Sequence, residues 1–238
     1  MTNETGDSMT QASQRHYIKY TFFKVDPQWR RLPRSEREAG AAEFLAAAES
    51  FSDEMRISTY NLQGMRGDAD FMLWQITRRI ELLQELAIKL AGSALGAYLT
   101  TPYSYLAMTK HSTYVEHHRH AGQEGATAQP RPKGTKYLFV YPFVKTRPWY
   151  RLSKEERQRM MNEHFVVGHK YPTVKINTAY SFGLDDQEFM LSFETESPSD
   201  FLDLVTELRE SEASSYTLRD TPIFTCINQD LKDILHTL

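Results

Sequence analysis

The sequence predicts an α+β protein in which one structural unit occurs twice, each copy forming an antiparallel sheet with helices on one face. Two observations carry this prediction. Segments of the first half of the chain recur in the same order about 120 residues later. Both halves also alternate short runs of β-branched and aromatic residues with longer amphipathic runs, which are typical of strands and helices respectively.

The recurrence is strongest around two strands that contain a lysine. Tyr-Thr-Phe-Phe-Lys at 20–24 resembles Tyr-Pro-Phe-Val-Lys at 141–145, and a proline, a tryptophan, a leucine and a Glu-Arg pair follow each segment. Further matches keep the same order, pairing 56–59 with 175–178, Gly64 with Gly183, and 71–73 with 189–191. Such ordered matches indicate an internal duplication.

We expect the first copy to begin with a strand at 17–24 and a helix at about 35–50. Strands at 55–62 and 69–76 flank the Gly64 turn, an amphipathic helix follows, and a strand at 103–109 closes the unit. The apolar stripe of that second helix consists of Ile80, Leu83, Leu86, Ala87 and Leu90.

The second copy repeats this order. A strand at 137–144 precedes a helix at 153–164, which opens on a capping box of Ser153 and Glu156. Strands at 172–181 and 187–194 flank the Gly183 turn. A helix that starts at Ser197-Pro198 and a strand at 222–227 complete the unit. The apolar stripe of this helix consists of Phe201, Leu204, Val205 and Leu208.

The order β-α-β-β-α-β is the ferredoxin-like arrangement. Two such antiparallel sheets on one chain are expected to pack their open faces together and share a core, as in a dimeric α+β barrel. We therefore divide the chain into a flexible N-terminal tail (1–15), an N-terminal unit (16–110), a connecting loop or lid (111–136) and a C-terminal unit (137–238) that carries the candidate site. The connecting loop is polar and rich in Gly and Pro.

Composition argues against several classes of function. A net charge of -3 does not suit a protein that binds nucleic acid through phosphate contacts. No apolar run approaches the roughly 20 residues that a membrane-spanning helix needs. A single cysteine, Cys226, excludes an intramolecular disulfide framework and a cysteine-cluster metal site, so we expect a cytoplasmic protein.

Chemistry is expected where the two copies differ. The counterpart of His164 is Phe44, and the counterpart of Tyr141 is Tyr20 or Thr21, depending on where a one-residue slip falls. One interpretation of His164 is a helix C-terminal residue that the helix dipole favours. The other is an axial ligand to a haem-type iron, for which histidine is the usual protein ligand.

A porphyrin held by one histidine needs an apolar slot and cationic groups for its propionates. Met160, Met161, Phe189 and Leu191 are candidates for the slot, although each also suits an ordinary core. Lys145, Arg147 and Arg209 are candidates for the cations, although each also suits a solvated surface. Periodicity does not distinguish these alternatives.

Several motifs together resemble the chlorite dismutase-like family, which includes the coproheme decarboxylases. They are Val-Tyr-Pro-Phe-Val-Lys (140–145), Glu-Glu-Arg (155–157), Met-Met-x-Glu-His (160–164), Gly-Leu-Asp-Asp (183–186) and Leu-Arg-x-x-Glu-Ala-Ser (208–214). The resemblance covers nearly the whole chain and is strongest over 136–225. It implies a pair of ferredoxin-like units that assemble as a homopentamer.

The resemblance also implies roles for single residues. His164 falls on the proximal iron ligand, and Tyr141 falls on the tyrosine that becomes a radical and attacks the propionates. Lys145 falls on the lysine that holds a reacting propionate. Arg209 and Ser214 fall on propionate-binding residues, and Met161 joins the cofactor-binding set.

The group opposite the proximal ligand distinguishes branches of the family. Chlorite dismutases need an arginine seven residues before the Gly-Leu-Asp-Asp glycine, where this chain has Ile176. An aliphatic side chain cannot hydrogen-bond a chlorite oxygen, so chlorite dismutation is not expected. One group of decarboxylases uses a distal histidine from the connecting loop, which the count places at His118, with His117 beside it.

The resulting hypothesis is peroxide-dependent oxidative decarboxylation of iron coproporphyrin III (coproheme) to haem b in haem biosynthesis. The partners are then the iron porphyrin, as substrate and product, and hydrogen peroxide. The alternative is a haem carrier or sensor of the same family with only weak peroxidase activity. Ile176 and the long connecting loop favour the carrier, whereas Tyr141 and Lys145 favour the enzyme. A cofactor-free structural barrel is the third class.

Overall fold

A computed structural model describes residues 15–110, 114 and 132–238. The predicted tail, apart from its last residue, and the histidines of the connecting loop lie outside this range. We refer to 15–110 as the N-terminal half and to 132–238 as the C-terminal half. No helix in the described ranges is long and apolar enough to cross a membrane.

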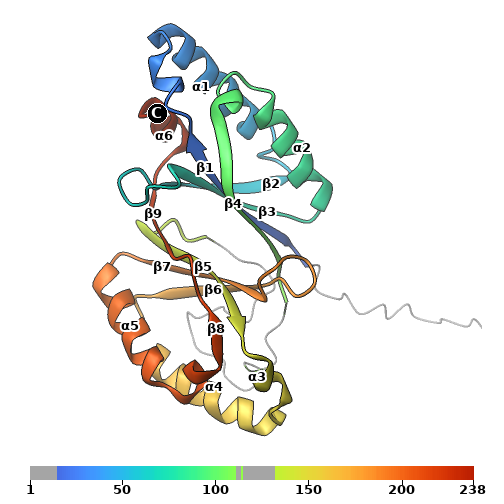
Figure 1. Cartoon of the computed structure of the whole chain (residues 1–238), viewed down its shortest axis with the longest axis vertical. Helices are drawn as coiled ribbons and strands as arrows, with labels where there is room; N and C mark the ends of the chain where they lie inside the picture. Colours follow the sequence, from blue (N-terminus) through green and yellow to red (C-terminus); the bar gives the residue numbers. More distant parts are fainter. Residues whose placement is uncertain (1–14, 111–113, 115–131) are drawn as a thin grey trace, which may run out of the picture.

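The N-terminal half has the predicted element order (Figure 1). Its elements are β1 (Tyr17–Val25), the 3-10 turn η1 (Trp29–Arg31), α1 (Arg34–Glu49), β2 (Met55–Asn61), β3 (Phe71–Thr77), α2 (Ile80–Ala91), η2 (Gly96–Tyr98) and β4 (Leu99–Met108).

The C-terminal half repeats that order with additions. Its elements are β5 (Tyr137–Lys145), α3 (Arg147–Arg151), α4 (Lys154–His169), β6 (Lys175–Tyr180), β7 (Phe189–Thr195), α5 (Pro198–Glu210), η3 (Glu212–Tyr216), β8 (Thr217–Arg219), β9 (Phe224–Asn228) and α6 (Leu231–His236). The capping box of Ser153 and Glu156 is present. Ser197 caps α5 by accepting a hydrogen bond from the Asp200 amide, as the Ser-Pro start predicts.

Eight of the described strands form a closed ring. The N-terminal half contributes the order β4-β1-β3-β2, and the C-terminal half contributes β6-β7-β5-β9. The two sheets join where β4 pairs with β6 and where β2 pairs with β9. All these pairings are antiparallel, so the fold is the predicted α+β barrel of two ferredoxin-like units.

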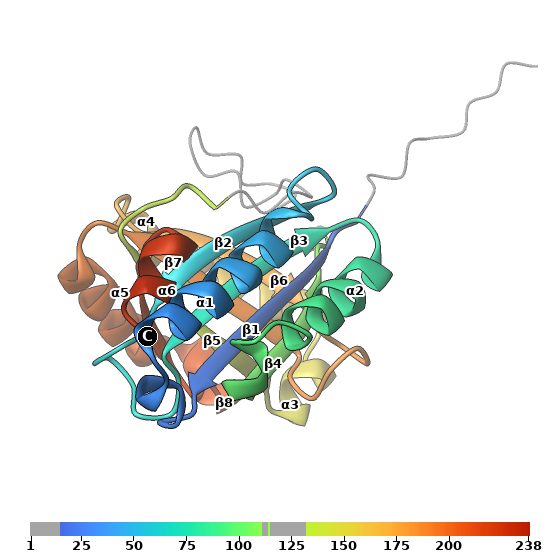
Figure 2. The ribbon, with the colours of Figure 1, turned by 90° about the horizontal axis from the view of Figure 1, so that it is seen from above.

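The barrel has one core inside and two outside, with a small further cluster around Trp149, Met160 and Ala213. Both halves supply the inner core, including Tyr20 and Trp74 from one and Met190 and Phe224 from the other. The outer core of the N-terminal half lies under α1, α2 and α6 (Figures 1 and 2). The outer core of the C-terminal half lies between its sheet and α5, and α3, α4 and α5 lie on the side of the barrel opposite α1 and α2 (Figure 1).

The duplication is visible in the strand register. Tyr17 pairs with Thr77 and Phe23 with Phe71 in the first half. Tyr137 pairs with Thr195 and Phe143 with Phe189 in the second. The helices α1 and α4 both contain 16 residues and start 120 positions apart. Residues of β1, β3 and α1 therefore have defined counterparts in β5, β7 and α4.

The structure corrects four details of the element prediction. After β5 the chain forms the short helix α3, which the predicted element order lacks, and Pro148 lies in its first turn, where its missing N–H costs nothing. The helix that was expected to end at His164 continues to His169, so His164 is not its C-terminal residue. Strand β4 corresponds to two shorter strands, β8 and β9, in the second half. Helix α6 is additional and packs on the N-terminal half through Leu231, Ile234 and Leu235.

Candidate functional site

The strand register identifies the counterparts of the predicted site residues. Tyr141 pairs with Leu191, as Thr21 pairs with Leu73, so the counterpart of Tyr141 is Thr21 and not Tyr20. By the same register, the counterpart of Lys145 is Val25. Phe44 and His164 each occupy the eleventh position of their helix. The C-terminal half thus has a phenol, an ammonium group and an imidazole where the N-terminal half has a hydroxyl, an isopropyl group and a phenyl ring.

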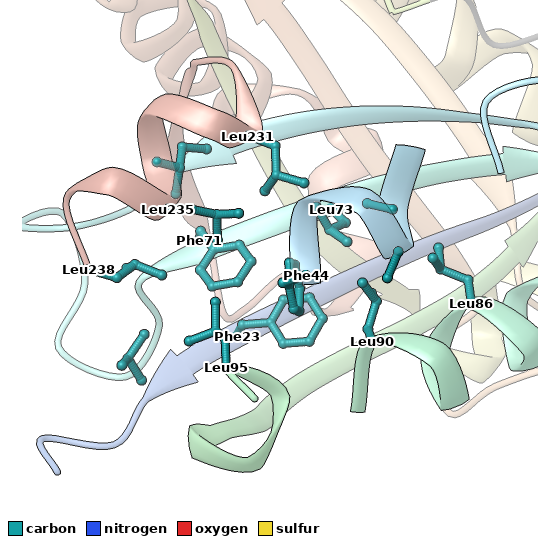
Figure 3. Close-up of a cluster of buried hydrophobic side chains, with 14 of the residues drawn as sticks. Phe23, Phe44, Phe71, Leu73, Leu86, Leu90, Leu95, Leu231, Leu235 and Leu238 are labelled. Carbon is teal, nitrogen blue, oxygen red and sulfur yellow. The ribbon is translucent and has the colours of Figure 1, made fainter. Parts of the chain in front are cut away.

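In the N-terminal half this region is a closed core. Phe44 is fully buried, and its ring centroid lies 5.9 Å from those of Phe23 and Phe71 (Figure 3). Helix α1 approaches closely because position 40 is glycine. A Cβ atom there would lie 2.9 Å from Cη2 of Trp29. Dense packing around Phe44 leaves no space for a ligand between α1 and the rings of Phe23 and Phe71.

The same region of the C-terminal half is less completely covered. Met160 occupies the place of Gly40 and is the one buried residue of α4, whereas α1 buries four. On the outer face of the sheet, Phe143 and Phe189 are half-buried. Their counterparts Phe23 and Phe71 are buried. A bulky side chain on the helix and incompletely covered rings on the sheet suit a flat apolar ligand between them.

Lys145 is held at the end of β5, next to these rings. Its Nζ donates a hydrogen bond to the carbonyl oxygen of Ala213 at 2.6 Å. The same Nζ lies 4.6 Å from the ring centroid of Trp149 and 5.3 Å from that of Phe143. Burial lowers the pKa of Lys145 to about 8, and the charge of Glu188 opposes this shift. The ammonium group is therefore still mostly charged near neutral pH.

His164 has the electrostatics of a ligand imidazole. Burial and, to a smaller extent, the positive charge of Lys145 lower its pKa to about 4. The ring is therefore neutral at pH 7, as a nitrogen that coordinates iron must be. Since the charge of Lys145 acts on His164, the β5 ammonium group lies near the α4 imidazole.

Tyr141 lies on the same outer face of β5 as Lys145, since alternate residues of a strand share a face. It is buried, and burial raises the pKa of its phenol well above the ordinary value. The negative charge of Asp220 raises the pKa of Tyr141 further, and the positive charge of Arg209 lowers it. The Arg209 Nη2 pairs with Asp220 Oδ2 at 2.5 Å, and the Ser214 hydroxyl donates to the Arg209 carbonyl oxygen at 2.6 Å.

The remaining predicted residues divide into three groups. Met161 is half-buried beside Trp149 and Met160. Ile176 lies on the outer sheet face, because it pairs with Phe193, which pairs with Phe139. Its side chain is exposed, so an aliphatic group stands at the edge of this face. His118 and His117 lie outside the described residues, and their role stays a prediction.

Sequence reasoning missed three residues of the site: Glu188, Tyr150 and Asp220. Glu188 is buried and accepts hydrogen bonds from the Lys145 amide at 2.8 Å and the Tyr150 hydroxyl at 2.5 Å. The repeat contained a signal for Glu188, because Asp70 occupies its place in the first copy. Asp220 has no comparable signal, since its importance arises from the break between β8 and β9.

The donor set fits an iron porphyrin that carries carboxylate arms. It offers a neutral imidazole on one side, aromatic rings for a macrocycle, and the cationic groups of Lys145 and Arg209 for propionates. A site for a bare metal ion is a poorer fit. No group of three or more His, Cys, Asp or Glu side chains that could hold a metal ion occurs among the described residues.

Comparisons with known proteins identify relatives over most of the chain. The chain is 32% identical over 210 residues to a coproheme decarboxylase of Mycolicibacterium smegmatis, with 88% of each chain covered. It is 29% identical over 220 residues to a coproheme decarboxylase of Staphylococcus carnosus, covering 84% of this chain and 86% of that one.

Solved structures show the same fold. A mutant chlorite dismutase from Candidatus Nitrospira defluvii matches with a TM-score of 0.86 and 28% identity, covering 93% of this chain and 94% of that one. A heme-binding protein from Thermus thermophilus matches in fold, with a TM-score of 0.82 and 23% identity over the same shares. The family model described as chlorite dismutase matches residues 37–229. The chain therefore belongs to the chlorite dismutase family.

Proposed function

We propose that this protein catalyses the peroxide-dependent oxidative decarboxylation of coproheme to haem b, with the porphyrin as both substrate and product. One observation carries the proposal. The C-terminal half has His164, Lys145 and Tyr141 at the positions where its duplicate has Phe44, Val25 and Thr21. The names of the two curated relatives give the reaction class.

Three kinds of side chain bind the substrate in this proposal. His164 is the proposed iron ligand, because its lowered pKa keeps a nitrogen lone pair free at neutral pH. The half-buried rings of Phe143 and Phe189, with Met161, contact the macrocycle. Lys145 holds a reacting propionate, while Arg209 and Ser214 hold other propionates.

Tyr141 is the proposed oxidant of the propionate. The bound iron, with hydrogen peroxide, supplies the two-electron oxidation that each propionate requires. Burial keeps the Tyr141 phenol protonated, so it gives up a proton together with an electron. The resulting phenoxyl radical takes a hydrogen atom from the propionate CH2 that is attached to the macrocycle. Loss of CO2 and of one more electron then leaves a vinyl group. For each propionate, one carboxylate, one hydrogen peroxide and one proton become one vinyl group, one CO2 and two waters.

On the distal side of the porphyrin, opposite His164, the proposed residue is chosen from the sequence alone. His118 is the proposed base that takes a proton from peroxide, since an ordinary histidine titrates near neutral pH. Ile176 brings no polar group to the sheet edge, and this argues against chlorite as the substrate. The resemblance further suggests assembly as a homopentamer, which light scattering of the purified protein would test.

The test is incubation of the protein with coproheme and hydrogen peroxide, followed by mass spectrometry of the porphyrin. We expect two propionates each to lose CO2 and two hydrogens. Tyr141→Phe is expected to bind coproheme as the wild type does and to form at least about a thousandfold less product, because the variant lacks the phenolic hydrogen. Tyr137→Phe, on the same strand face, is the matched control and should react normally.

Two other outcomes would redirect the assignment. Binding of coproheme without decarboxylation by the wild type would favour the carrier or sensor function. Normal turnover by Tyr141→Phe would remove this tyrosine from the mechanism.

A further inference from the structure

A single buried carboxylate links the elements around Lys145. Glu188 directly precedes β7, and its main-chain N–H donates to the Phe143 carbonyl oxygen at 3.2 Å. Its Oε2 accepts hydrogen bonds from the Lys145 amide at 2.8 Å and from the Tyr150 hydroxyl at 2.5 Å. Its Oε1 lies 3.8 Å from Nη1 of Arg147. One side chain therefore joins the end of β5 to both ends of α3.

The orientation of the Lys145 side chain depends on this corner. The β5 register becomes irregular between Val144 and Lys145, so the sheet alone does not fix the main chain there. The hydrogen bond from the Lys145 amide to Glu188 fixes it instead. From that position the ammonium group reaches the Ala213 carbonyl oxygen and lies over the Trp149 ring.

Comparison with the N-terminal half shows which contacts of Glu188 belong to the shared scaffold. In the N-terminal half, Asp70 accepts a hydrogen bond from the Val25 amide at 2.8 Å, so the bond from carboxylate to strand end belongs to the shared scaffold. The other partner of Asp70 is Lys24, at 3.0 Å. In the C-terminal half the acidic side chain is one methylene longer and binds the phenol of Tyr150, whose counterpart is Arg30.

This difference coincides with the site. The scaffold bond is kept in both halves, and the added phenol contact occurs only in the half where the strand ends on a lysine. The negative charge of Glu188 also raises the pKa of Lys145, against the lowering that burial causes.

We propose that Glu188, together with Tyr150, is a positioning residue that presents the Lys145 ammonium group to the propionate that reacts. This inference rests on the proposed function, because it assigns the carboxylate arm of coproheme as the partner of Lys145. It predicts that Glu188 sets the preference of the protein for coproheme over haem b, which lacks the two reacting carboxylates.

The experiment compares the dissociation constants of coproheme and haem b, measured by Soret titration, in four variants. Glu188→Gln is expected to reduce the preference for coproheme about tenfold, the size expected when a charge-assisted hydrogen bond is weakened. Lys145→Met should reduce the preference at least as much, and the double variant should add little to it. Asp70→Asn is the matched control. It removes the equivalent carboxylate in the other half, so it should lower the melting temperature and leave the preference unchanged.

The outcomes separate the two proposals. If Glu188→Gln lowers only the melting temperature, as Asp70→Asn does, Glu188 is structural and the inference is overturned. If Glu188→Gln does not fold, Tyr150→Phe takes its place, and an unchanged preference there also overturns the inference. A wild type that prefers coproheme but never forms vinyl groups contradicts the proposed reaction alone. A wild type that binds neither porphyrin contradicts both.

Discussion

The two halves of this protein share a strand register but use the space under their first helix differently. In the N-terminal half, Gly40 lets α1 approach, and Phe44 fills the gap down to Phe23 and Phe71. In the C-terminal half, Met160 and His164 occupy the same helix positions, and the rings of Phe143 and Phe189 on the sheet are only half-buried. The duplicated backbone therefore does not by itself determine function. In the proposed function, a few side chains determine whether the space under the helix is a core or a ligand site.

An exchange of the two helix residues should have the largest effect on stability. Phe44→His places an imidazole in a sealed aromatic core, which removes packing and buries an unpaired polar group. We expect the free energy of unfolding, measured in urea, to fall by about 3 kcal/mol or more. His164→Phe should not destabilise the protein, because the ring removed is desolvated and the fold accepts phenylalanine at this position. Equal losses in both variants would show that the two regions are packed alike.

The close approach of α1 gives the second prediction. Gly40→Met installs the residue of the other half where a Cβ atom would already lie 3.1 Å from the Leu95 amide nitrogen. Overpacking of this kind should cost about 1–3 kcal/mol in urea unfolding. Gly168→Met in α4 is the control, because nothing lies within 4 Å of its Cβ position and methionine is the better helix former. A neutral Gly40→Met would contradict the tight fit of α1.

The third prediction concerns pH. Burial lowers the pKa of Lys145 to about 8, so its ammonium group is charged below that pH and loses its proton above it. Because the charged form binds the propionate, coproheme affinity should fall above pH 8 by up to about tenfold per pH unit. Val25 shows that the fold tolerates an apolar residue at this place, and Lys145→Met should give a flatter profile. A wild-type profile that stays flat to pH 10 would count against contact between Lys145 and the propionate.

The internal repeat is the reason why the sequence predicts the element order and the barrel. The matched segments fix the element order, and the order fixes the barrel, because two open sheet faces must cover each other. The ends of elements depend on tertiary contacts. Helix α4 continues through Phe165 to His169 because no stop signal follows His164, and α6 forms because Leu231, Ile234 and Leu235 bury on the other half.

The sequence predicts a site residue where the two copies carry different types of side chain at matched positions. The difference between His164 and Phe44 is displayed directly by the aligned repeats. The sequence match instead pairs Lys145 with Lys24, so the difference between Lys145 and Val25 appears only in the strand register. Glu188 was missed because it does not differ in kind from Asp70, and its contact with Tyr150 is visible only in three dimensions. Asp220 becomes important because the chain leaves the sheet between β8 and β9, so that its carboxylate meets Arg209.

The central claim is that the C-terminal half alone binds one porphyrin, through His164. The most direct measurement is a Soret titration of the wild type, His164→Phe and Phe44→His with coproheme. The account predicts one porphyrin per chain for the wild type and for the folded fraction of Phe44→His, and loss of the ligated Soret band in His164→Phe. Two porphyrins per wild-type chain, or an unchanged band and affinity in His164→Phe, would contradict it.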